Sequence, residues 1–423
     1  MGNHELKIAG KLTYVIKNML YFSYIDYKVF LWTSSYMGFI PTAIRRKCMK
    51  LPSKPESYFW AILAMVMLLT ACAMNNSEDD IWSWGNYPEL GTGPAEFTVV
   101  PLEAGTFDKI NPMGHMNLPQ HPIPTGAGGF SFSSNGYSQP VKAPADGLIT
   151  AIRFTHVYGP DNITSFPDYA VRIYHTNTFL TWYDHLSAID AAILAKTGEL
   201  KEGWTKTYVK VKAGDVFGKT AASPEQVVGL GMYAYDKEKT LDFINPQRYG
   251  PFGAHTVFAF DYFRQDIKDQ LFSYIKRTAE PRGGKIDFDM AGTLSGNWIV
   301  EGSDVISSPD PWNYFLAFVY DMYYPESKRI SIGVELGTTI GKIYGILTQP
   351  VEGPEYTEVT IASGPVVYKL ADAVEGQNSV PSTSDIKYTL LAQVVEENKI
   401  KVELFDGNID SPSFTGSEIT YTR

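Results

Sequence analysis

Histidine and cysteine are the side chains of this 423-residue sequence best suited to chemistry at neutral pH, and it contains seven histidines and two cysteines. Two cysteines are too few for a disulfide-rich scaffold or for a zinc site of cysteine alone. A catalytic metal would therefore need histidine and carboxylate ligands, and three such ligands with one open position lower the pKa of zinc-bound water to about 7. The first histidines to consider are His115 and His121, in a stretch rich in glycine and proline, and His185.

Short strands must position these histidines, because residues 97–260 consist of alternating apolar segments separated by glycine and proline turns. The clearest strand patterns are 147–154, 169–174 and 178–183. Helical spacing predicts one helix over Leu186–Leu200 and a second over 261–277. Glu280-Pro-Arg-Gly-Gly284 ends the second helix, so we expect one domain over 96–278.

Three motifs occur in this domain in a fixed order. Pro140-Val-Lys-Ala-Pro-Ala-Asp-Gly147 comes first, a segment containing Tyr183-Asp-His-Leu186 follows, and Val211-Lys-Ala-Gly-Asp-Val-Phe-Gly218 is last. The ordered set resembles the core motifs of lysostaphin-type (LytM-like) zinc endopeptidases. This resemblance implies the duplicated hybrid motif, a compact antiparallel β fold, and an ancestry of peptidoglycan cross-bridge hydrolysis by a single zinc ion.

The family's zinc ligands are only partly present in this chain. Members hold zinc with a His-x-x-x-Asp pair and a further histidine, and two other histidines assist the metal-bound water. His115 is followed four residues later by Pro119, and His121 by Thr125, so neither supplies the aspartate. The family's His-x-His is expected near Gly229–Asp236, where this chain has no histidine.

We therefore expect zinc catalysis to be lost and no cofactor to be required. His185 matches the family's Tyr-x-His-Leu histidine and is the residual catalytic candidate, whereas His175 matches a position outside the metal shell. One alternative is that His185 is a framework residue bonded to backbone or to Asp184. Another alternative is an active zinc endopeptidase with a displaced ligand set, for which the metal-ligand candidates are His121, His115, His255 and Asp236.

A domain of this kind without zinc would still have a groove for binding. The expected partners are cell-wall peptide or glycan, or another envelope protein. Aromatic residues that could stack on sugar rings are Tyr158, Tyr174, Trp182, Tyr183, Tyr233 and Tyr235. The alternative for these residues is ordinary packing within strands.

The N-terminal part reads as an export signal. Residues 58–71 are apolar and uncharged, Lys50 and Lys54 precede them, and Cys72 follows. Leu69-Thr-Ala-Cys72 resembles the lipobox of bacterial lipoproteins, which implies that Cys72 is lipidated after cleavage. We expect an upstream extension outside the fold over 1–48, a signal peptide over 49–71 and a tether over 72–95.

A lipid anchor implies a protein of the cell envelope, attached to the membrane through Cys72. Ala73 and Met74 replace the aspartate that often retains lipoproteins in the inner membrane, so we expect the outer membrane, facing the periplasm or the cell surface. Removing residues 1–71, with nine Lys/Arg and three Asp/Glu, changes the formal net charge from −10 to −16. Such a negative chain is not suited to nucleic acid.

The C-terminal part, 285–423, consists almost entirely of predicted strands, so the whole chain is expected to be mainly β. Gly296 and Trp298 on its first strand, with Arg423 on its last, resemble the signature of calycins, in which the arginine covers the tryptophan. The resemblance implies an eight-stranded antiparallel β-barrel, and a β-sandwich is the alternative. A barrel would allow a further function, carrying a small hydrophobic ligand.

Overall fold

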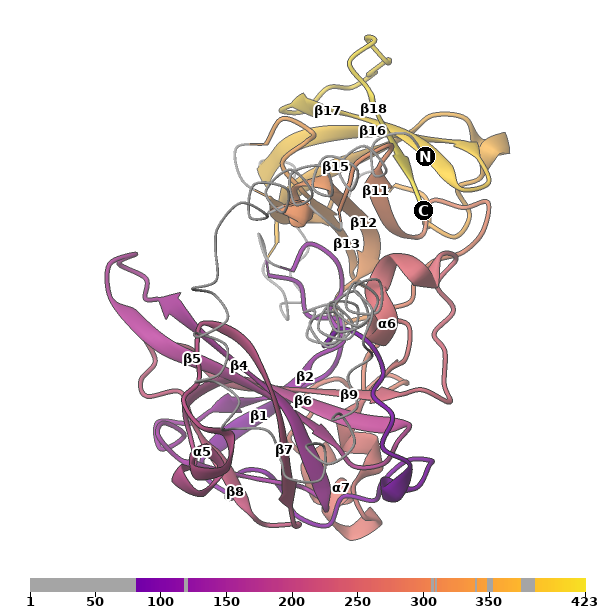
Figure 1. Cartoon of the computed structure of the whole chain (residues 1–423). Coiled ribbons are helices and arrows are strands. Elements are labelled where there is room, and N and C mark those ends of the chain that lie inside the picture. Colours follow the sequence, from indigo (N-terminus) through magenta and orange to yellow (C-terminus); the bar gives the residue numbers. More distant parts are fainter. Residues whose placement is uncertain are drawn as a thin grey trace, which may run out of the picture. The chain divides into compact units, whose positions relative to one another are not determined.

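The computed structural model describes residues 81–117, 121–305, 308, 310–338, 341–347, 353–373 and 385–423 (Figure 1). All of them belong to one compact unit, Ser77–Arg423. Cys72, the predicted signal peptide and the upstream extension lie outside the described residues. Within the described part, no helix is both long and apolar enough to cross a membrane.

The first part of this unit is a ten-stranded, largely antiparallel sheet. Its main order is β1 (Phe107–Asn111), β2 (Gly128–Phe132), β9 (Gly229–Asp236), β6 (Phe179–Ile189), β5 (Ser165–Tyr174), β4 (Gly147–Tyr158) and β7 (Gly203–Val211). Beside this path lie β10 (Thr256–Val257), β3 (Pro140–Lys142) and β8 (Val216–Thr220). The strands that carry or border the three sequence motifs therefore all lie in one sheet: β3 and β4 for the first motif, β5 and β6 for the second, and β8 for the third.

The two faces of this sheet are packed differently. Along β6, Phe179 and Tyr183 enter the main hydrophobic core, whereas Leu180 and Trp182 belong to a second, aromatic cluster on the other face. Trp84 packs on this second cluster and donates a hydrogen bond from Nε1 to the Pro251 carbonyl oxygen at 2.9 Å. Part of the segment 81–95, which the sequence assigns to the tether, thus packs against the sheet through the buried Ile81 and the partly buried Trp84, Tyr87 and Leu90.

Both predicted helices are shorter than the sequence pattern indicates. Strand β6 continues to Ile189, and α5 spans only Ala191–Thr197, with the Asp190 carboxylate accepting a hydrogen bond from the Ala192 amide at 2.8 Å. The second helix, α7, spans Gln265–Phe272. After α7 the chain turns at residues 273–274, and Ile275 forms an isolated parallel bridge with Ile110 of β1, whose amide donates to the Tyr274 carbonyl at 3.1 Å.

The second part is a closed eight-stranded antiparallel barrel, not a sandwich (Figure 1, orange to yellow). Its strands are β11 (Gly296–Val300), β12 (Phe315–Tyr320), β13 (Lys328–Ile332), β14 (Lys342–Ile346), β15 (Val366–Asp372), β16 (Ile386–Glu396), β17 (Lys399–Asp406) and β18 (Ile419–Thr422). Pairing of β11 with β18 closes the barrel. The mainly β fold class and the barrel are confirmed, while the exact domain bounds remain predictions.

The barrel interior is filled by large side chains. Trp298, Phe318, Tyr356, Tyr368 and Tyr421 are all completely buried within one cluster. Phe318, Tyr356 and Tyr368 are in mutual ring contact, with centroids 5.4–6.2 Å apart. These contacts leave the centre of the barrel occupied by packed protein.

Arg423 covers Trp298, as the sequence predicts. The guanidinium carbon of Arg423 lies 4.1 Å from the centroid of the Trp298 ring. Its nitrogens also donate hydrogen bonds to the carbonyl oxygens of Met290, Thr293 and Ser295. The last residue of the chain therefore ties β18 to the segment that leads into β11.

Candidate functional site

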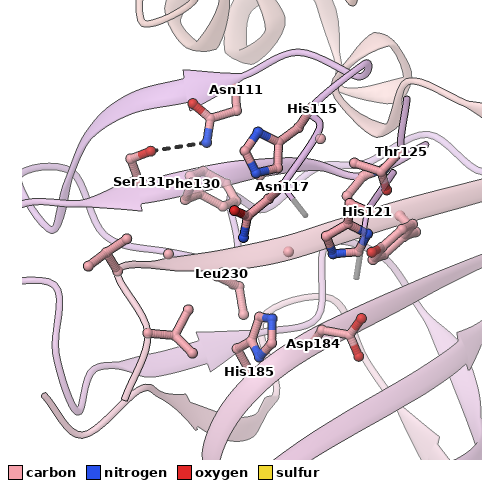
Figure 2. A pocket seen from close by; sticks show the side chains of 18 residues that line it. Asn111, His115, Asn117, His121, Thr125, Phe130, Ser131, Asp184, His185 and Leu230 are labelled. Atoms are coloured by element: carbon pink, nitrogen blue, oxygen red, sulfur yellow. Dashed lines mark hydrogen bonds between the residues drawn. The ribbon is translucent and has the colours of Figure 1, made fainter. Parts of the chain in front are cut away.

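Three of the seven histidines meet at one pocket on the sheet (Figure 2). The pocket, called the histidine pocket below, has a volume of about 250 Å³. Its polar lining comes from Asn111, His115, Asn117, His121, Thr125, Ser131, Asp184, His185 and Tyr233. The structure thus brings together the candidates His115, His121 and His185.

A β-bulge directs two successive residues of β6 toward this pocket. The register between β5 and β6 shifts between Tyr169 and Val171, and Asp184 and His185 are the extra residues on β6 at this point. His185 has a φ of +69°, a left-handed conformation that non-glycine residues adopt rarely. Without the bulge the two side chains would alternate to opposite faces, so the strained backbone is what lets both line the pocket.

His185 is bonded to a buried carboxylate from the neighbouring strand. Its Nδ1 lies 3.1 Å from Asp168 Oδ1, and the Asp168 side chain is almost completely buried. Arg153 of β4 lies between Asp168 and Asp184, 3.4 Å from each carboxylate, and Trp182 Nε1 donates to Asp184 at 2.8 Å. The partner of His185 is therefore Asp168 rather than Asp184 or backbone, and both carboxylates have a cationic neighbour.

The surroundings of His185 and His121 shift the pKa values of these two histidines in opposite directions. Burial opposes charge on His185, but its hydrogen bond to Asp168 and the negative charges of Asp168 and Asp184 outweigh burial and raise its pKa above 6.5. Burial lowers the pKa of His121, and the proximity of His115 lowers it further. The surroundings therefore favour the protonated form of His185 and disfavour that of His121.

His115 and His121 are held by a narrow hairpin. The Gly114 amide donates to the Thr125 carbonyl at 2.8 Å and the Thr125 amide to the His115 carbonyl at 3.0 Å. Asn117 and His121 exchange backbone hydrogen bonds of 3.0 and 2.8 Å. The two imidazole centroids are 6.4 Å apart, and Figure 2 shows both rings and the Asn117 amide turned toward the same space.

The strands below the hairpin provide little metal-binding chemistry. On β9, the pocket is lined by Gly229, Leu230, Gly231 and Tyr233, and Leu230 also belongs to the main core together with Met232 and Ala234. On β2, the Ser131 hydroxyl lines the pocket and accepts a hydrogen bond from the Asn111 amide at 3.1 Å (Figure 2). The β9 segment in which the family carries His-x-His thus presents glycine and tyrosine.

The other candidates lie elsewhere. His255 Nδ1 bonds to the Lys239 carbonyl at 2.6 Å and borders a different cavity. Asp236, at the end of β9, is buried, and its carboxylate accepts from the Tyr262 hydroxyl at 3.3 Å. His175 is buried between the Asp146 carbonyl and the Thr181 hydroxyl, and burial lowers its pKa to about 4. None of these three lines the histidine pocket.

The residues present do not fit a zinc site. Among the described residues, no group of three His, Cys, Asp or Glu side chains is close enough to hold a metal ion. Two imidazoles on one tetrahedral zinc, each with its nitrogen about 2.0–2.1 Å from the metal, have closer ring centres than the 6.4 Å between His115 and His121. We therefore derive no reaction step through zinc.

The aromatic candidates are divided between packing and surface. Tyr174 and Tyr183 are fully buried, and Trp182 and Tyr235 nearly so. Tyr158 is largely exposed at the end of β4, away from the pocket lining, and Tyr233 alone of the six lines the histidine pocket. Packing therefore accounts for four of these side chains.

Sequence reasoning missed the residues that surround His185. Asp168 and Arg153 lie 17 and 32 positions before it in the sequence, on other strands. Only the register of β4, β5 and β6 brings them together, so no local pattern marks them. Asp184 did carry a signal, since it directly precedes the histidine in Tyr183-Asp-His-Leu186.

Comparisons with known proteins find only distant likeness. No family model and no curated protein matches this chain. Among solved structures, it is similar to a zinc-containing peptidase from Vibrio cholerae, at 18% identity and a TM-score of 0.23, over 34% of this chain and 37% of that one. It is also similar to the complex of SpoIIIAH and SpoIIQ, at 13% identity and 0.23, over 33% and 92%. A third match is lysostaphin in solution, at 14% identity and 0.23, over 62% and 98%.

The chain spans 37% of the length of the Vibrio peptidase. TM-scores this low carry no argument about activity. The function of the site is therefore inferred from the chain's own motifs, strand order and pocket.

Proposed function

We propose that this protein is a lipid-anchored protein of the cell envelope whose sheet domain binds cell-wall peptide or glycan, or an envelope protein, without zinc catalysis. The observation that carries the proposal is the histidine pocket. It is lined by residues from the motif-bearing strand β6, yet β9 presents Gly229, Gly231 and Tyr233 to it. Among the described residues no three His, Cys, Asp or Glu side chains are placed to hold a metal ion, and a cavity with this hydrogen-bonding lining is suited to holding a polar ligand.

The pocket offers hydrogen bonds of several kinds to a polar ligand. The side-chain amides of Asn111 and Asn117 and the hydroxyl of Thr125 can both donate and accept, and the imidazoles of His121 and His185 add sites whose pKa values are shifted in opposite directions. Asp184 and Arg153 neutralise each other beside the cavity. A chain with amide and hydroxyl groups, as in cell-wall glycopeptide, matches this lining.

We assign the barrel a calycin-like identity and a structural role. Gly296, Trp298 and Arg423 support the first assignment through the arginine–tryptophan stack. The packed tyrosines of the interior support the second and speak against a carrier of small hydrophobic ligands. Native mass spectrometry of the purified full chain tests the carrier alternative, which a stoichiometric co-purified apolar molecule would establish.

The experiment that tests the proposed function uses the full chain in detergent. We expect it to co-sediment with purified peptidoglycan sacculi, to release no muropeptides on chromatography, and to contain no stoichiometric zinc. Two preparations of sacculi are compared, one stripped of attached proteins and one that retains them. If the chain co-sediments with neither preparation, binding is refuted. Stoichiometric zinc together with muropeptide release would establish the alternative, an active zinc endopeptidase with a displaced ligand set.

Gly231→Leu provides a variant that fills the pocket. A Cβ added at Gly231 meets only Asp184 Cβ and the Tyr233 ring, both at 3.7 Å, which are ordinary contacts. Gly129 is unsuitable, because its Cβ would lie 2.6 Å from a backbone oxygen. We expect Gly231→Leu to lose sacculus binding while melting like the wild type. Ile163→Ala, at a surface site outside the pocket, is the control expected to bind normally.

A further inference from the structure

A second cavity adjoins the histidine pocket and reaches onto the barrel. This cavity, called the proline–tryptophan groove below, has a volume of about 260 Å³. Pro122, Ile123 and Pro124 of the histidine hairpin form one wall. Pro311, Trp312 and Phe315, at the start of β12, form the other wall.

The two cavities are adjacent and share two lining residues. His121 and Thr125 line both of them. These two residues lie between the cavities, so a ligand that occupies both would pass over the hairpin at His121 and Thr125. One of the two cavities is polar and the other is mostly apolar.

The barrel fixes the hairpin that separates and connects the cavities. Leu316 and Phe318 of β12 point into the barrel, so Ala317 and Val319 point outward, yet both are completely buried. They are covered by a small cluster that includes Met116 of the hairpin, with Ile123 packed against it. The barrel surface thus sets the position of the histidine hairpin through apolar packing.

We propose that the proline–tryptophan groove is a subsite for an apolar side chain of a peptide whose backbone enters the histidine pocket. The inference rests on the proposed function and specifies its ligand as peptide rather than glycan at this position. It also gives the barrel a role in binding, since Trp312 and Phe315 belong to it.

The lining of the groove favours an apolar side chain over a sugar ring. Three of its residues are prolines, which have no backbone N–H to donate, and Ile123, Trp312 and Phe315 add apolar surface. Apart from the indole N–H of Trp312, the polar side-chain groups of the groove come from His121 and Thr125 at the shared end. A buried sugar hydroxyl without a partner is costly, whereas an apolar side chain gains free energy in proportion to the area it buries.

The test uses detergent-solubilised full chain and synthetic pentapeptides Ser-Ala-X-Ala-Ser, with X either leucine or glycine, together with an N-acetylglucosamine tetramer. Affinities are measured by ligand-observed NMR. We expect the leucine peptide to bind wild type about tenfold more tightly than the glycine peptide, as burial of one apolar side chain implies. Trp312→Ala should remove this difference, and Trp312→Phe should retain most of it.

Trp82→Ala is the matched control, because Trp82 is also partly exposed but lies in the aromatic cluster of the sheet. It should leave the leucine preference unchanged. Equal binding of the two peptides, or a leucine preference that survives Trp312→Ala, would overturn the inference. Tetramer binding that depends on Trp312 would assign the groove to sugar instead and would also overturn it. If the chain binds sacculi but shows no leucine preference, the subsite fails and the proposed function stands.

Discussion

His185 combines a strained backbone with a bond to a buried carboxylate, and together these two features predict that two substitutions destabilise the protein to different extents. In His185→Ala the bond to Asp168 is lost while the left-handed φ of +69° remains. In His185→Gly the same bond is lost, but glycine adopts this conformation freely. We therefore expect both variants to be destabilised, and the alanine variant more than the glycine variant.

The magnitudes follow from the geometry. A hydrogen bond to a charged group contributes about 1.5–3 kcal/mol, and solvent screening of a side chain that is 37% exposed reduces this to roughly 1–2 kcal/mol for His185→Ala. The left-handed conformation costs a non-glycine residue about 1–2 kcal/mol, which the greater chain entropy of unfolded glycine offsets by about 0.5–1 kcal/mol. His185→Gly should therefore be more stable than His185→Ala by roughly 0.5–1 kcal/mol.

The effect should depend on pH with a definite sign. The pKa of His185 is higher in the folded chain than its ordinary 6.5, so its bond to Asp168 stabilises most below pH 6.5 and loses strength as the pH rises through the folded pKa. Native-state hydrogen exchange of β5 and β6 amides at pH 5.5 and 9 measures this local stability. A cost of His185→Ala that is equal at both pH values, or removed by zinc, would refute the reasoning.

Two further predictions concern the N-terminal part. Cys72→Ser should move the protein from the membrane to the soluble fraction on cell fractionation, and a variant that stays membrane-bound would contradict lipidation at Cys72. Trp84→Ala removes the bond to Pro251 and ring contacts with Phe252 and Tyr174, so it should destabilise by about 2–3 kcal/mol and speed proteolysis within residues 81–95. Cleavage rates equal to wild type would show that this segment is held by other contacts.

The fold was largely predictable because its signals are local. Turn motifs such as Pro140–Gly147 and Val211–Gly218 mark corners of the sheet, and their order along the chain is enough to indicate its kind. Gly296, Trp298 and Arg423 indicated the closed barrel from three positions. The two helices were overestimated, because apolar spacing at Leu186 and Ile275 also fits extended chain that pairs with β8 and β1.

The site was less predictable because it is assembled from distant parts of the chain. His185 could be identified from its own motif, but Asp168 and Arg153 reach it only through strand register. The hairpin with His115 and His121 contacts β12, about 200 residues later, and no sequence pattern records that contact. Packing between distant segments, rather than composition or spacing, decides which histidines share a pocket.

The contribution of Arg423 to the stability of the barrel can also be predicted from its contacts. Its guanidinium lies 4.1 Å from the Trp298 ring centroid, donates to three carbonyl oxygens and is largely removed from water, and burial lowers its pKa to about 10. A desolvated cation–π contact contributes about 2 kcal/mol and each charged hydrogen bond about 1.5–3 kcal/mol, part of which water restores.

We therefore expect Arg423→Ala to destabilise the barrel by roughly 3–5 kcal/mol in urea unfolding followed by tryptophan fluorescence. Arg423→Lys keeps the charge but lacks the planar fork, so it should recover less than half of the loss. Trp298→Phe keeps an aromatic ring beneath the guanidinium and should cost less than Arg423→Ala, since the three carbonyl bonds remain. If Arg423→Lys matched the wild type, charge alone would account for the stabilisation, and the fork geometry that ties β18 to β11 would have no energetic role.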